Sequence, residues 1–88
     1  MNGRALVAWN LRRLRTERGI SQERLAADAG VDRAYISELE REQGNVTVDL
    51  LDRLAFVLDV AVGEFFAASP EAGGRISPLP AGRKPRRP

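Results

Sequence analysis

Apolar residues along the first two thirds of the chain recur every three or four positions, the spacing that keeps one face of an α-helix apolar. In the first such stretch, Val7, Leu11 and Leu14 share a face. Gly19 ends this stretch, because glycine adopts the left-handed cap conformation at the least cost. No segment alternates apolar and polar residues with period two, so the pattern predicts helices and no strands.

Residues with capping side chains mark three more helices. Ser21, Asp32 and Thr47 carry short polar side chains that accept hydrogen bonds from the first backbone amides of a helix. Gly30 and Asp59 tolerate left-handed backbone and are predicted to end the second and fourth helices. The inward positions of these helices are Leu25, Ala26, Ala29, Val31, Ile36, Leu39, Leu51, Leu54, Ala55 and Leu58.

A change in composition divides the chain near residue 70. A short fifth helix is predicted at residues 62–68, with Phe65 buried. All five prolines lie at or beyond Pro70, and proline is not tolerated in a helix interior. We therefore expect a helical domain at residues 1–69 and a disordered tail, rich in proline and glycine, at residues 70–88.

The charges follow the same division. Residues 1–69 carry 9 arginines and 11 acidic residues, or −2, whereas residues 70–88 carry 5 basic residues and 1 acidic residue, or +4. The formal net charge of +2 is therefore positive because of the tail. The tail is interpreted either as a solvated charge run or as a segment that follows a nucleic-acid backbone and releases counterions.

Composition excludes several classes of function. The 88 residues include no cysteine and no histidine, which excludes disulfides, makes a zinc site very improbable and removes catalysis by an imidazole or a thiolate. No apolar run is longer than that of residues 54–58, which is far shorter than the roughly 20 residues that span a bilayer. We expect a single cytoplasmic binding domain with no catalytic residues, no cofactor, no metal and no membrane contact.

The stretch from Gln22 to Leu39 carries most of the functional information. It contains two helices of about eight residues, joined by a tight turn at Gly30. Ala26 lies where the two helices must cross closely, and larger side chains there would separate them. The outer face of residues 32–42 then projects as a ridge one helix wide, which fits the major groove of B-DNA, about 12 Å across.

Three segments in and around this stretch resemble the helix-turn-helix domains of the Cro and lambda-repressor-like family, also called the xenobiotic response element family: GISQERLA at 19–26, GV at 30–31 and YISELER at 35–41. The resemblance covers about residues 7–67. It implies an all-α, five-helix lambda-repressor-like domain in which helices two and three form the helix-turn-helix. The implied function is that of a sequence-specific bacterial transcriptional regulator, a repressor, that binds a palindromic operator in double-stranded DNA as a homodimer.

The resemblance also implies which residues contact DNA. Gln22 would donate to a phosphate, and the outward positions of the third helix would face base edges. By their chemistry, Arg33 could donate to guanine and Ala34 could touch a thymine methyl. Glu38 could accept from cytosine, or it could repel purine acceptors and phosphate. The complete set of implied DNA-binding residues is Gln22, Arg33, Ala34, Ser37, Glu38, Arg41, Asn45 and Thr47. Arg15 and Glu40 match a pair that joins the first and third helices in this family.

Glu42 departs from the family, which often has glycine at this position. We therefore expect helix three to run on to Gln43 and to end at Gly44. The outer face of residues 32–42 also carries charges of both signs. This predicts modest affinity of a single domain for DNA.

Some apolar residues exceed what the inward faces require. Leu50, Phe56, Val57 and Phe66 either complete a small core or form a patch on helices four and five that buries against a second copy. We favour the second interpretation, and thus a dimer interface made by these four residues.

Other functions remain open on the sequence alone. The alternatives within the same scaffold are a restriction–modification controller protein, an antitoxin that regulates its own operon and a protein-interaction module. The negative balance of residues 1–69 favours the interaction module slightly. No small-molecule ligand site is evident, and an enzyme is the least supported class.

Overall fold

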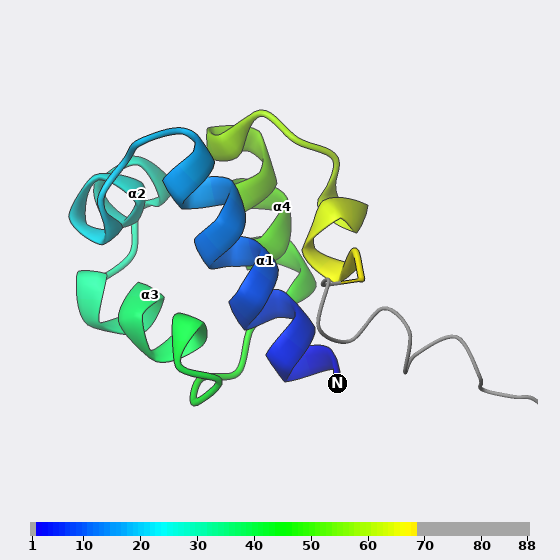
Figure 1. Ribbon diagram of the computed structural model, residues 1–88. Coiled ribbons are helices and arrows are strands. Elements are labelled where there is room, and N and C mark those ends of the chain that lie inside the picture. The colour runs from blue at the N-terminus through cyan, green and yellow to red at the C-terminus, as the bar shows by residue number, and fades with distance from the viewer. Residues whose placement is uncertain (1, 69–88) are drawn as a thin grey trace, which may run out of the picture.

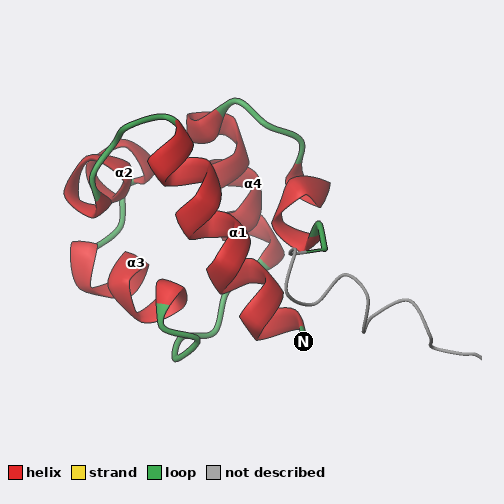
Figure 2. Ribbon diagram, viewed as in Figure 1, coloured by secondary structure: helices red, strands yellow, loops and turns green. Residues whose placement is uncertain are grey.

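The computed structural model describes residues 2–68, and helices joined by loops are the regular structure of this part of the chain (Figures 1 and 2). The elements are α1 (Gly3–Glu17), α2 (Gln22–Ala29), α3 (Arg33–Glu40), α4 (Val48–Leu58) and a 3-10 helix, η1 (Val62–Phe66). The prediction of an all-α fold without strands is confirmed for residues 2–68. The short fifth helix predicted at residues 62–68 is a 3-10 helix and ends earlier, at Phe66. The tail lies outside the described residues, and none of the described helices is both long and apolar enough to cross a bilayer.

Helices α2, α3 and α4 begin at the predicted residues. The hydroxyls of Ser21 and Thr47 each accept from the backbone amide three residues on, at 2.9 and 3.0 Å. Asn2 caps α1 in the same way at 2.9 Å. Asp32 precedes α3, as predicted, but its side chain makes no capping hydrogen bond. The backbone carbonyl of Asp32 accepts from the amides of Tyr35 and Ile36 and so begins the hydrogen bonding of α3.

Each α-helix of the described part is followed, within two residues of its end, by a residue in the left-handed backbone conformation. Gly19, Gly30 and Asp59 take φ of 67°, 74° and 58°, which confirms the predicted ends of α1, α2 and α4. The predicted end of α3 is wrong: the helix stops at Glu40, and Glu42 takes φ of 65°. Backbone hydrogen bonds that close over this left-handed residue satisfy the last carbonyls of the helix.

Gly44 serves close packing and not helix termination. It is buried, and a Cβ atom there would lie 3.1 Å from Cδ2 of Leu39 and 3.4 Å from Cε1 of Tyr35. The loop after α3 therefore lies directly against α3, an approach that only glycine permits without displacing a neighbour.

The core lies between α1, α4 and the α2–α3 pair, with η1 packed on the side of α1 (Figure 1). Every predicted inward residue is buried except Val31, which is half-buried against the core. Leu50 is also a core residue, with 3% of its surface exposed. Each such leucine contributes about 1.5–3 kcal/mol by leaving water.

Asn10 is a polar residue of the described core with none of its surface exposed. Its Nδ2 donates to the carbonyl oxygens of Phe65 and Ala67 at 3.0 and 2.8 Å, and its Oδ1 accepts from Arg13 at 3.0 Å. This amide holds η1 against α1. The hydrophobic pattern did not predict it, because its partners lie 55 and 57 positions away.

Candidate nucleic-acid interface

One side of α3 is buried and the opposite side faces solvent. Ile36 and Leu39 are in the core, whereas the side chains of Arg33, Ala34 and Glu38 are exposed. The helix lies beside α2 at the periphery of the molecule (Figure 1). Eight residues make it about 12 Å long at 1.5 Å per residue. A short, exposed ridge of mixed charge is the result.

A buried ion pair fixes α3 against α1, as the sequence predicted. Nε of Arg15 lies 2.7 Å from Oε2 of Glu40, and Nη2 lies 2.9 Å from Oε1. The two side chains keep only 12% and 5% of their surface exposed. The hydrogen bond that Arg15 donates to Glu40 raises the pKa of Arg15 against the opposing effect of burial. The guanidinium therefore stays charged, and the forked contact sets the orientation of α3.

Gln22 belongs to the same polar cluster. Its amide nitrogen donates to Oε1 of Glu40 at 3.0 Å. Arg15 also donates to the carbonyl oxygen of Ile20, just before α2, at 2.9 Å. These bonds join the ends of three helices, so the first residue of α2 is positioned by the last residue of α3.

The loop from residue 41 to residue 47 carries the remaining predicted contacts. Arg41 is exposed, and its guanidinium donates to the half-buried hydroxyl of Ser37. The exposed Asn45 accepts from Arg4 through its side chain and from the hydroxyl of Tyr35 through its backbone carbonyl. Thr47 is exposed but is occupied as the cap of α4.

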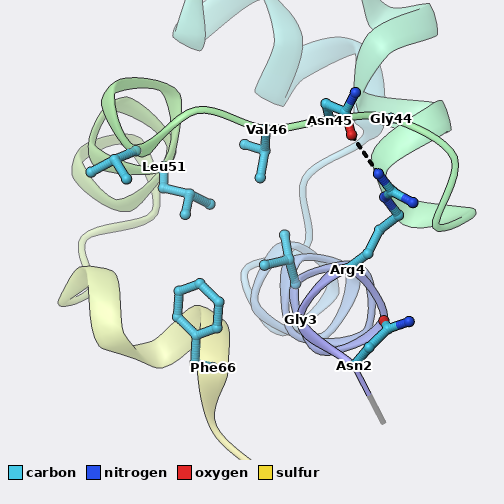
Figure 3. Close-up of a pocket in the computed structure, with 10 residues that line it drawn as sticks. Asn2, Gly3, Arg4, Gly44, Asn45, Val46, Leu51 and Phe66 are labelled. Carbon is cyan, nitrogen blue, oxygen red and sulfur yellow. Dashed lines mark hydrogen bonds between the residues drawn. The ribbon is translucent and has the colours of Figure 1, made fainter.

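The structure thus brings the eight predicted DNA-binding residues to α3, to the first turn of α2 and to the loop after α3. Sequence reasoning missed Arg4, which reaches this loop from the first turn of α1 (Figure 3). No local pattern indicates a contact between residues that are 41 positions apart.

Only part of the predicted dimer patch is exposed at the surface. Phe56 is 86% exposed and Phe66 49% exposed, and Val57 is half-buried. Leu50 does not fit this patch, because it completes the core and offers almost no surface to a partner. Val48 is 71% exposed and was not predicted.

The chain is similar to known proteins in both sequence and structure. A family model described as helix-turn-helix matches residues 11–65. A protein of Neisseria meningitidis, described as a hypothetical transcription factor, is 41% identical over 58 residues, which cover 66% of this chain and 55% of that protein. The match therefore spans about half the length of that relative.

Two solved structures are similar to this fold. The restriction–modification controller protein C.AhdI from Aeromonas hydrophila aligns with a TM-score of 0.69 and 41% identity, covering 72% of this chain and 96% of that one. The controller protein C.Esp1396I, solved as a tetramer with its natural 35 base-pair operator, aligns with a TM-score of 0.67 and 33% identity, covering 75% and 87%. The family match extends over more than half of the sequence, and the chain belongs to the helix-turn-helix family.

Proposed function

We propose that this protein is a sequence-specific DNA-binding transcriptional regulator, a repressor, in which α2 and α3 form the helix-turn-helix and α3 reads the major groove. The observation that carries the proposal is the exposed face of α3, set in a fixed orientation by the buried contact between Arg15 and Glu40. A rigid ridge of this width is what the major groove admits. The operator-bound protein of similar fold supports the DNA-binding part of this proposal.

The exposed side chains of α3 have the chemistry for reading bases. Arg33, in the first turn, can donate two hydrogen bonds to O6 and N7 of guanine. Ala34 presents a methyl group suited to thymine, and Glu38 can accept from N4 of cytosine. These three residues are the proposed readers of the operator.

Contacts on the two flanks of α3 would set its register on the duplex. Gln22 uses one amide hydrogen for Glu40, and the amide nitrogen carries a second one that suits a phosphate oxygen. Asn45 is exposed on the loop after α3. Phosphate contacts of this kind position a protein without reading sequence.

A homodimer is the proposed working unit. Phe56 and Phe66 expose large apolar surfaces on α4 and η1, away from the core. A second copy packed against them would remove this surface from water and relate two α3 helices by a twofold axis. Such a dimer would bind half-sites about one helical turn, roughly 34 Å, apart. The relevant operator is then an inverted repeat.

The test is selection of bound fragments from random double-stranded DNA. We expect an enriched inverted repeat, bound less tightly as salt rises. On that operator, Arg33→Ala should weaken binding by about 5- to 150-fold, the equivalent of one lost bidentate base contact. Arg12→Ala, which removes an exposed arginine from α1, is the matched control. If selection enriches no motif, the function is that of a protein-interaction module instead.

A further inference from the structure

Arg4 links the first turn of α1 to the loop that follows α3. Its Nη2 donates to Oδ1 of Asn45, as Figure 3 shows. Both side chains are exposed. The contact therefore forms at the surface, at the polar rim of a groove whose floor is lined by Val7, Val46 and Leu51.

Asn45 is also held from the side of α3. The hydroxyl of Tyr35 donates to its backbone carbonyl, and the preceding Gly44 is buried against Leu39. The main chain of Asn45 is thus fixed by α3, while its side chain is fixed by α1.

The chemistry of the two groups determines the orientation of the amide. A guanidinium carries only hydrogen-bond donors. Of the two ends of an asparagine side-chain amide, it can therefore bond only to the oxygen. With Oδ1 turned to Arg4, the two hydrogens on Nδ2 are directed away from it. Arg4 therefore presents a positive charge and further donors beside an amino group of fixed direction.

The site lies on the flank of α3 that Gln22 does not occupy. Gln22 contacts Glu40, whereas Asn45 contacts Tyr35. Residues five positions apart on a helix lie about 140° apart around its axis. The two contacts thus lie on either side of the proposed reading face.

We propose that Arg4 and Asn45 form a binding site for a backbone phosphate of DNA, in which Arg4 is a positioning residue that sets the direction of the Asn45 amide. This inference rests on the proposed function, because it supplies the second flanking contact for α3. A phosphodiester oxygen is the ligand that suits a set of amide and guanidinium donors with a positive charge.

The experiment measures affinity for the selected operator with wild type, Arg4→Ala, Asn45→Ala and the double variant. We expect each single variant to bind about tenfold more weakly, which equals about 1.4 kcal/mol. The double variant should bind no more weakly than Arg4→Ala alone, because Asn45 loses its direction once Arg4 is gone. Arg12→Ala controls for loss of one positive charge from α1.

A multiplicative loss of about a hundredfold in the double variant would mean independent charge and amide effects and would overturn the positioning role. Unchanged affinity in both single variants would overturn the site. NMR of the free protein tests the contact without DNA. Arg4→Ala should shift the side-chain amide resonances of Asn45, and Arg12→Ala should not. An unmoved resonance would overturn the contact alone, whereas a wild type that selects no DNA motif would overturn the proposed function together with this site.

Discussion

Glu42 stands in left-handed backbone at the end of α3, and replacing it with glycine should stabilise the protein. Its φ of 65° is one that residues with a Cβ atom adopt at a cost. The hydrogen bonds that close the helix end are already made, with the amide of Gln43 2.9 Å from the carbonyl oxygen of Glu38. Glycine would keep these bonds and remove the strain.

The expected gain follows from two opposing effects. Left-handed conformation costs about 1–2 kcal/mol for a residue with a side chain. Glycine reduces the gain in stability by about 0.4–1 kcal/mol, because it raises the conformational entropy of the unfolded chain. The exposed side chain of Glu42 contributes no burial to either state. We therefore expect Glu42→Gly to raise the free energy of unfolding by about 1 kcal/mol, or the midpoint of thermal unfolding by about 4–8 °C.

The assay is thermal and urea unfolding of both variants at one protein concentration, since the proposed dimer would make stability concentration-dependent. Glu42→Ala is the matched control, because it removes the same charge but keeps the Cβ atom. If alanine stabilises as much as glycine, charge and not backbone strain explains the effect. A destabilised Glu42→Gly would refute the reasoning.

Three further predictions concern packing and assembly. Glu40→Leu leaves the buried guanidinium of Arg15 unpaired and should cost about 3–5 kcal/mol by urea unfolding; adding Arg15→Met should restore most of this, and a double variant no more stable than the single would contradict the pairing. Gly44→Ala should cost about 1–3 kcal/mol, since its Cβ atom would crowd Leu39; wild-type stability would show that the loop yields freely. Phe66→Glu should give a monomer by sedimentation and lower operator affinity, whereas an unchanged sedimentation coefficient in a dimeric parent would remove η1 from the interface.

Much of the fold was predictable because the determinants are local. A cap such as Ser21 and a left-handed residue such as Gly30 act within one turn of the helix they bound. Inward faces such as that of Leu51, Leu54 and Leu58 follow from helical periodicity. The end of α3 was mispredicted because Glu42 has no intrinsic preference for left-handed backbone. Packing of the loop against α3 imposes that conformation.

The candidate site was predictable only as a set of positions. The exposure of Arg33 follows from the period of α3, but the contacts that orient the site join distant segments. Arg4 and Asn45 lie 41 positions apart, and Gln22 and Glu40 lie 18 positions apart. The pattern also left Leu50 ambiguous, because α4 is apolar over a broad face and only the packed structure shows which side is covered.

The most direct test of the account is a titration of the 15N-labelled protein with the selected operator, followed by backbone and side-chain amide resonances. The account predicts that the resonances which move most belong to residues 33–38 and to the side-chain amides of Gln22 and Asn45, and that a scrambled duplex moves them far less. Changes confined to the face that carries Phe56, with residues 33–38 unmoved, would contradict the claim that α3 reads DNA.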